Sequence, residues 1–506
     1  MKTIRILLAL CLFCAGTAGA EDRPNFVFIL ADDLGVGDVS HLNPDSKIST
    51  PNIDTLASEG ITFLDAHSSA SVCTPTRYSF LTGRYSWRSP LKERVVSGYS
   101  KSIIEQGLPT IASMLRDHGY RTAMFGKWHL GLDWQKKDGT RVSELRPAES
   151  IEAEIDFTSG FEGGPLSHGF EYFFGINASL DFPPYVFVEN DKALTVPTGM
   201  QAKQGERGKP SHQFMMRSGL KDVEFDPQQV LKTLTEKAVD YIKAQNADQP
   251  FFIYIPLNSP HTPVVPREEF LGSSSAGVYG DFIQETDWSV GQVKAALQER
   301  GLLQNTILVF SADNGASRAS FSTKHEKEFD HKPSAIYRGR KAGLHEGGHR
   351  VPLVISWPKG ITARSSNDQL VVLNDFYATM ADIVGDDTAK SGVADSFSLL
   401  PIFKAEEEKY TRTSAIHHDF AGRFSFREGP WKLLLNKDKQ ELFNLKEDPS
   451  EGNNLFEQRP DIVMDLTVKI SRQIRDGRST PGPVLPNSPP LHWEQLYWMS
   501  GEGETN

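Results

Sequence analysis

The sequence has 506 residues and a net charge of −11, with 39% hydrophobic and 24% charged residues. This length is enough for one large domain and a smaller one, and the composition is ordinary for a globular protein. The acidic balance excludes general nucleic-acid binding, which needs a basic surface. A site for anions must therefore be a local cluster of positive charge.

The first twenty residues read as a signal peptide. Lys2 and Arg5 precede an apolar run over residues 6–14, and Ala18-Gly19-Ala20 offers small residues for cleavage. The run is too short to cross a bilayer, and no other long apolar segment follows. We expect an exported protein, periplasmic or secreted, without a membrane span. Cleavage leaves 52 basic and 65 acidic residues, a net charge of −13.

Beyond the signal peptide, uninterrupted apolar runs predict strands that are buried on both faces of a parallel sheet. In chain order these runs are Asn25–Ala31, Phe251–Pro256, Thr306–Ser311 and Leu353–Ser356, and Arg121–Phe125 is read as a further strand. Segments with a helical period separate them, at residues 110–118, 230–242 and 283–297. This alternation predicts an α/β fold, a large mostly parallel sheet between layers of helices, over residues 21–400. Residues 401–506 are predicted to form a smaller α+β subdomain, with a hairpin at 431–445 and a helix at 461–475.

Polar residues follow four of the predicted strands within a few positions. They are Asp32-Asp33, Lys127-Trp128-His129, Ser259-Pro260-His261 and Asp313-Asn314. Ligands of open α/β sheets bind at the carboxyl ends of the strands, so these side chains are expected to form one site. The oxygen ligands Asp32, Asp33, Asp313 and Asn314 select calcium or magnesium. The alternative for Asp32-Asp33 alone is a helix cap.

Cys73 is the only cysteine outside the signal peptide, since Cys11 and Cys14 lie within it. A lone cysteine is usually a buried apolar side chain. Here it opens the segment C-T-P-T-R, residues 73–77, which L-T-G follows at residues 81–83. This segment resembles the signature of type I sulfatases, within the alkaline phosphatase-like superfamily. The resemblance implies that Cys73 is oxidised to formylglycine (3-oxoalanine) by a formylglycine-generating maturation enzyme, and that its hydrate is the nucleophile.

The resemblance extends over nearly the whole chain after the signal peptide. N-F-V-F-I-L-A-D-D-L-G at 25–35, G-K-W-H-L-G at 126–131 and A-D-N-G at 312–315 are similar to family segments. Lys341 with E-G-G-H-R-V-P at 346–352 and the late stretch E-L-F-N-L at 441–445 are similar as well. The order of these segments is also that of the family.

The family's roles carry over to matching positions. One Ca²⁺ per subunit is expected on Asp32, Asp33, Asp313, Asn314 and residue 73. The expected catalytic and substrate-binding residues are Cys73, Arg77, Lys127, His129, His261 and Lys341, of which Lys127, His261 and Lys341 hold the sulfate. Ser179 aligns loosely with a serine that touches this site.

The resemblance also implies a reaction sequence. One hydroxyl of the hydrated aldehyde attacks sulfur, and His129 takes the proton of the other, so that the aldehyde reforms and sulfate leaves. His261 is the candidate general acid for the leaving group, with Asp313 as the alternative.

Sulfated carbohydrates, such as polysaccharide or glycosaminoglycan fragments, are the expected substrates. The alternatives are an aryl sulfatase of broad specificity, a phosphonate or phosphate ester hydrolase of the same superfamily, and a non-catalytic sugar-binding protein. Specificity is expected from residues 132–221 and 317–340, where Asp181 is either a substrate contact or a structural residue. His168, His331, His345 and His349 have no assigned role, and Glu346 and Arg350 are expected to form turns and ion pairs.

Overall fold

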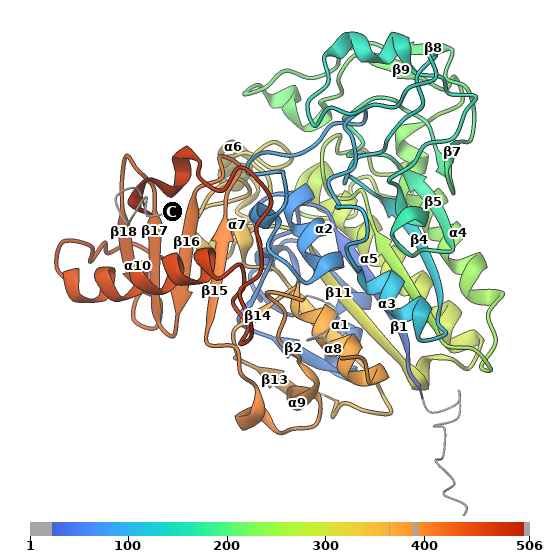
Figure 1. Cartoon of the computed structure of the whole chain (residues 1–506). Coiled ribbons are helices and arrows are strands. Elements are labelled where there is room, and N and C mark those ends of the chain that lie inside the picture. The colour runs from blue at the N-terminus through green and yellow to red at the C-terminus, as the bar shows by residue number, and fades with distance from the viewer. Residues whose placement is uncertain (1–22, 364, 388–392, 500–506) are drawn as a thin grey trace, which may run out of the picture.

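The structure is a computed structural model that describes residues 23–363, 365–387 and 393–499 (Figure 1). The predicted signal peptide lies outside these residues. The described residues form a ten-stranded central sheet in the order β13-β2-β12-β11-β1-β10-β4-β5-β6-β7. Its middle strands β11, β1, β10, β4 and β5 are all parallel to their neighbours in this group. The predicted mostly parallel sheet is confirmed.

The central strands contain the apolar runs found in the sequence. Their bounds are β1 Asn25–Ala31, β4 Arg121–Lys127, β5 Tyr172–Ile176, β10 Phe251–Pro256 and β11 Thr306–Ala312. All seven residues of β1 are buried, because β10 and β11 flank it and helices cover the sheet. The outer strands are β2 Ile61–Phe63, β6 Val188–Glu189, β7 Lys192–Ala193, β12 Leu353–Ser356 and β13 Ser365–Asn367.

One predicted strand has a different direction from that expected. Leu353–Ser356 forms β12 and is fully buried, but it runs antiparallel to β11 and β2. An apolar run records that a strand is buried on both faces, and burial is the same whichever way the strand runs. The parallel direction inferred for this strand is therefore wrong.

Helices pack in two groups about the sheet. The larger elements are α1 Pro51–Glu59, α2 Cys73–Thr82, α3 Ile111–Asp117, α4 Val230–Lys243, α5 Gly277–Glu299 and α8 Asp375–Val384, and the short ones are α6 Thr323–Phe329, α7 Glu346–His349 and α9 Leu400–Phe403. α5 packs on α1 and α4, while α2, α3 and α8 pack on one another. The rings of Phe80 in α2 and Phe376 in α8 lie 4.3 and 4.8 Å from that of Phe28 in β1, so α2 covers this face of the sheet.

The C-terminal part forms a small antiparallel sheet beside the central one (Figure 1). Its strands are β15 Ser414–His418, β16 Phe424–Glu428, β17 Trp431–Leu435 and β18 Glu441–Asn444, and α10 Pro460–Arg475 packs on it. Its apolar core also contains Tyr85 and Trp87, which follow α2. The expected domain boundary at residue 400 falls at the start of α9 and stays a prediction.

Two further pairs of short strands complete the fold. β3 Ala66–His67 pairs with β14 Val371–Val372, and β8 Gly199–Gln201 pairs with β9 Gly219–Lys221. β8 and β9 lie in the segment drawn at the top of Figure 1, beyond one end of the central strands.

Candidate active site

The polar residues that follow the central strands meet at one edge of the sheet. The backbone N–H of Asp32 donates to the carbonyl of Ser259 at 2.8 Å, and that of Asp313 donates to the carbonyl of Ala31 at 3.0 Å. Loops after β1, β10 and β11 are therefore joined directly. This is the arrangement expected from the carboxyl ends of neighbouring parallel strands.

Cys73 is the first residue of α2 and is only 2% exposed. Its Sγ lies 3.6 Å from Oδ1 of Asp32 and 3.2 Å from Nζ of Lys341. Burial raises the pKa of the thiol to about 12, so it is protonated at neutral pH. The positive end of the α2 dipole favours negative charge at this position. The residue lies among charged groups, which argues against the reading of an inert apolar cysteine.

The loop before Cys73 is fixed by hydrogen bonds from two other parts of the chain. Ser71 donates its N–H to the carbonyl of His418 in β15 at 3.0 Å, and its carbonyl accepts from the N–H of Ala342 at 2.8 Å. Ala70 forms an isolated bridge with His418. The position of Cys73 thus depends on the C-terminal sheet and on the Lys341 loop.

Two lysines neutralise the first two aspartates. Nζ of Lys127 lies 2.5 Å from Oδ2 of Asp32, and Nζ of Lys341 lies 2.5 Å from Oδ1 of Asp33. Burial alone would raise the pKa of Asp32, but Lys127 and the other nearby cations outweigh it, and the pKa falls well below its usual value. Burial would likewise lower the pKa of Lys341, yet the Asp33 carboxylate keeps it well above its usual value. Both groups are charged at neutral pH.

Arg77 and Asp313 form a buried ion pair on the other side of Asp32. Nη2 of Arg77 lies 2.8 Å from Oδ2 of Asp313 and 3.8 Å from Oδ1 of Asp32, and Nη1 donates to the carbonyl of Lys127 at 3.0 Å. The adjoining A-D-N-G turn needs its glycine, because a Cβ on Gly315 would lie 2.0 Å from the carbonyl oxygen of Gly347. Tight packing therefore fixes Asp313 and Asn314.

The expected metal ligands fit a hard cation. Buried Oδ2 of Asp33 and Oδ1 of Asn314 have no hydrogen-bond partner among the described residues. One ligand atom from each of Asp32, Asp33, Cys73 and His261 can be chosen so that all lie within 4.8 Å of one another. Asp33 has a φ of 68°, a strained conformation that is common at functional sites. Buried acceptors left unpaired among carboxylates are what an oxygen-liganded cation would satisfy.

His261 adjoins this group of oxygen ligands. Its Nδ1–H donates to the carbonyl of Thr262 at 2.6 Å, and its Nε2 lies 3.7 Å from Oδ2 of Asp33. This hydrogen bond keeps a proton on Nδ1 and orients the ring so that Nε2 faces the site. The side chain is 10% exposed, so a bound molecule can reach it.

His129 and Ser179 form a second group beside the first. Nε2–H of His129 donates to the carbonyl of Val96 at 2.9 Å, and Oγ of Ser179 lies 3.4 Å from Nδ1. Burial, with Lys127 and Arg77 adding to it, lowers the pKa of His129 well below its usual value, so the ring is neutral and Nδ1 can accept a proton. With a φ of 57°, His129 is a second site residue in a strained backbone conformation.

Three residues of the site were not found from the sequence. Thr74 donates to the carbonyl of His129 at 3.0 Å and joins α2 to that loop, and Val96 fixes the imidazole through its backbone. Both atoms of the Asn258 side-chain amide are buried without a partner at the end of β10. Only Asn258 carried a signal, since it lies two residues after the predicted strand Phe251–Pro256. The helix-cap alternative for Asp32-Asp33 is wrong, because the next helical turn, Val36–Asp38, has Gly35 at its N-cap.

The histidines left without a role are structural where their contacts are defined. His168 stacks on Trp128, and Nε2 of His331 lies 2.8 Å from Oδ1 of Asp38. His349 lies 3.0 Å from His67, measured between their Nδ1 atoms, beneath the C-terminal sheet. Here Nζ of Lys432 lies 2.9 Å from a carboxylate oxygen of both Glu346 and Glu451.

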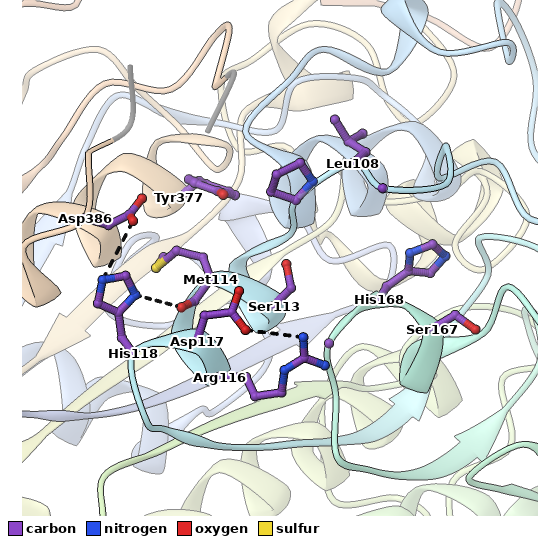
Figure 2. Close-up of a pocket in the computed structure, with 13 residues that line it drawn as sticks. Leu108, Ser113, Met114, Arg116, Asp117, His118, Ser167, His168, Tyr377 and Asp386 are labelled. Carbon is purple, nitrogen blue, oxygen red and sulfur yellow. Dashed lines mark hydrogen bonds and ion pairs between the residues drawn. The ribbon is translucent and has the colours of Figure 1, made fainter. Parts of the chain in front are cut away.

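A separate cavity of about 340 Å³ lies beside α3 (Figure 2). Its lining includes His118, which lies 3.7 Å from Asp386 and 2.9 Å from the carbonyl of Met114. His118 has no part in the site at the strand ends. None of the candidate site residues lines this cavity. It is therefore distinct from the site at the strand ends.

Comparison with known proteins identifies the family. A family model described as Sulfatase matches residues 24–385, which include every candidate site residue. The chain belongs to the sulfatase family. A second model, described as N-sulphoglucosamine sulphohydrolase, C-terminal, matches residues 340–479.

Among curated relatives of this sulfatase, an N-acetylgalactosamine-6-O-sulfatase of Bacteroides thetaiotaomicron is 31% identical, over 88% of this chain and 92% of the relative. Human steryl-sulfatase is 28% identical over 95% and 91%. A solved structure described under the metabolism of multiple glycosaminoglycans by Bacteroides thetaiotaomicron has a TM-score of 0.76 and 28% identity. It covers 89% of this chain and 99% of its own.

These findings confirm the resemblance to type I sulfatases of the alkaline phosphatase-like superfamily. The enzyme is a sulfuric ester hydrolase. Among its described residues, no helix is long and apolar enough to cross a membrane.

Proposed function

We propose that this sulfatase releases inorganic sulfate from sulfated carbohydrates, using a formylglycine made from Cys73 and one calcium ion. The observation that carries the proposal is the surroundings of Cys73: it begins α2 beside Asp32 and Lys341, with Arg77 one helical turn further on. A hydrated aldehyde at this position would have cations on hand for a sulfate group and a neutral histidine nearby. That combination suits sulfuryl transfer to a covalent intermediate.

The chain's own residues supply the steps that follow binding. Lys127, Lys341 and His261 hold the sulfate oxygens, and Arg77 holds the hydrate. One hydroxyl of residue 73 attacks sulfur as the alkoxide, and His261, acting as the imidazolium because its Nδ1–H is held by the carbonyl of Thr262, gives its Nε2 proton to the leaving oxygen. His129 then takes the proton of the second hydroxyl at Nδ1, and the aldehyde reforms as the C–O bond between Cβ of residue 73 and the sulfate ester oxygen breaks, so that inorganic sulfate leaves. The existing hydrogen bond to Val96 keeps Nδ1 in the accepting form.

Calcium would be held by Asp32, Asp33, Asp313 and Asn314 together with residue 73, and would draw electron density from the sulfate oxygens. Two features support it: the all-oxygen ligand set and the unpaired oxygens of Asp33 and Asn314. Zinc is disfavoured, because it prefers nitrogen and sulfur ligands.

A carbohydrate substrate is supported by the N-acetylgalactosamine-6-O-sulfatase named above. The relation to steryl-sulfatase keeps an aryl or other non-carbohydrate sulfate as the second candidate. A phosphonate or phosphate ester hydrolase is less favoured, since the family match is to sulfatases. A non-catalytic sugar-binding role is disfavoured because every expected catalytic residue is present.

We also propose that the protein is exported, to the periplasm or beyond, and that a formylglycine-generating enzyme is its maturation partner. The support for export is the signal-peptide pattern of residues 1–20.

The test combines mass spectrometry with sulfate release. We expect the peptide that contains residue 73 to be lighter by about 18 Da than its cysteine form, the exchange of sulfur for oxygen with loss of two hydrogens. We expect free sulfate from N-acetylgalactosamine 6-sulfate, and none from Cys73→Ala. An active native enzyme with unmodified cysteine would contradict the formylglycine. Cleavage of phosphate esters without sulfate release would favour the phosphonate or phosphate ester hydrolase.

A further inference from the structure

A cavity of about 600 Å³ adjoins the His129 side of the active site. Two of its lining residues, Ser97 and Phe182, connect it to the catalytic histidine. Ser97 follows Val96, whose carbonyl accepts from His129, and the ring of Phe182 lies 5.8 Å from the imidazole. The volume is in the range of sites for small organic ligands.

The wall of this cavity is rigid. Oε2 of Glu152 accepts from the hydroxyl of Tyr99 at 2.7 Å and from the N–H of Leu220 at 2.9 Å, which joins three segments of chain. A Cβ on Gly219 would lie 2.4 Å from Cβ of Pro183, so the start of β9 packs directly on the Pro183 turn. The cavity is a built site rather than a gap between loose loops.

Asp181 and Arg217 stand beside Phe182 and form an ion pair. The Asp181 side chain is 4% exposed, and its Oδ1 is buried without a hydrogen-bond partner in the part of the chain that the structure describes. The guanidinium carbon of Arg217 lies 3.7 Å from the centre of the Phe182 ring, and 42% of the Arg217 side chain is exposed. The pair therefore offers an unsatisfied acceptor next to accessible N–H donors.

An acceptor and donors placed side by side in this way can bind a hydroxyl or amide group. A carboxylate oxygen without a partner accepts from O–H or N–H, and the guanidinium donates to the adjacent oxygen. Besides Arg217, the charged residues that line the cavity are two acids, Glu149 and Glu152, and one lysine, Lys203, and Asp181 adjoins the cavity without lining it. The charges nearly balance, so an additional anionic group gains little here. Met200, Met215 and Met216 add apolar surface.

We propose that this cavity binds the uncharged part of the sulfated sugar, with Asp181 and Arg217 recognising neighbouring hydroxyl or acetamido groups of its ring. The inference rests on the proposed carbohydrate substrate and names the part of the molecule that selects it. Asp181 and Arg217 are specificity residues. They contact the sugar and leave the sulfate to the lysines.

The test compares two substrates in two variants, Asp181→Asn and Arg217→Gln. For N-acetylgalactosamine 6-sulfate we expect kcat/KM to fall at least tenfold in each variant. For 4-nitrophenyl sulfate, which lacks the hydroxyls, we expect a change of less than twofold. Arg459→Gln removes another exposed arginine that pairs with an aspartate, 2.8 Å from Asp461, and should leave both values unchanged.

Equal losses on both substrates would overturn the inference, because the pair would then support the catalytic centre itself. Unchanged values on both would overturn it as well. Calorimetric titration of the sugar sulfate into Cys73→Ala separates this failure from that of the proposed function. Binding that Asp181→Asn abolishes, together with a wild-type enzyme that releases no sulfate from this sugar, supports the subsite and contradicts the carbohydrate sulfatase. Absence of binding to Cys73→Ala overturns the subsite.

Discussion

Arg77 donates two hydrogen bonds to a single oxygen of Asp313, from Nε at 3.0 Å and from Nη2 at 2.8 Å, both to Oδ2. Burial and Asp32 raise the pKa of Asp313 to about 6, and Arg77 opposes the shift, so the carboxylate is ionised at neutral pH. A carboxylate held in this way is a poor proton donor. The arrangement favours His261 over Asp313 as the general acid.

Arg77→Lys should lower kcat at least a hundredfold while the protein stays folded. A lysine keeps the charge but cannot make the paired hydrogen bonds to Asp313 and the third to the carbonyl of Lys127, and lost preorganised donors cost about that factor. Steady-state kinetics should be normalised to the fraction of modified residue 73, measured by mass spectrometry. Arg84→Lys, beyond the end of α2, is the control, and equal activity of both variants would contradict the role of Arg77.

Calcium should raise the melting temperature of the unmodified protein, since a ligand that binds only the folded state stabilises it. At a hundred times Kd the gain is about 2.7 kcal/mol. Differential scanning fluorimetry with and without a chelator gives the shift. Asn314→Leu should abolish it, and Asp138→Asn, an exposed carboxylate away from the site, should preserve it. An equal shift in Asn314→Leu would place the ion elsewhere.

Arg88→Met should cost about 3–5 kcal/mol in the free energy of unfolding, because it leaves the buried carboxylate of Asp395 without its partner. Nε and Nη2 of Arg88 each lie 2.8 Å from an oxygen of Asp395, and both side chains are fully buried. Urea unfolding at pH 7 measures the loss. The double variant with Asp395→Asn should recover part of it, and no recovery would mean that the loss comes from packing.

The same pair should make this deficit pH-dependent. Burial would raise the pKa of Asp395, but Arg88 and the hydrogen bonds around the carboxylate outweigh it and lower the pKa. In the wild type the stabilisation is therefore present above the unfolded pKa, near 3.8, and is lost as the pH falls through the lower folded value. In Arg88→Met the unpaired carboxylate has a raised pKa and is neutralised by protonation. The difference in stability between the two proteins should narrow from pH 7 to pH 4, and a constant difference would contradict the ion-pair account.

Lys432→Met should destabilise the junction between the two sheets by about 3–5 kcal/mol, since Glu346 and Glu451 lose the buried cation between them. Activity of the folded fraction should fall as well, because the loop that precedes Cys73 is hydrogen-bonded to this C-terminal sheet. Melting temperature and kcat are the measurements, with Lys437→Met, an exposed lysine in the turn between β17 and β18, as the control. Full activity of folded Lys432→Met would show that the junction does not position the nucleophile.

The sequence predicted much of the fold because its signals are local. An apolar run such as Asn25–Ala31 followed at once by Asp32-Asp33 predicts both a buried strand and the side of the sheet on which a site forms. The direction of β12 could not be predicted, since burial has no direction. The Asp181–Arg217 pair lies 36 residues apart without a periodic pattern, and the contact of Val96 with His129 is made by a backbone carbonyl. Contacts of these kinds depend on how loops pack and carry no signature in residue type.

The hydrogen bonds from β15 to the loop before Cys73 bear on the order of folding and of the proposed oxidation of Cys73. Cys73 is almost wholly enclosed once Ser71 is bonded to His418, and His418 is synthesised some 345 residues after Cys73. The formylglycine proposed above would therefore require that the oxidising enzyme reach the thiol before that late segment docks. The distance along the chain between the two residues would then set a time window, in which the closing of the C-terminal sheet over the loop competes with the proposed maturation.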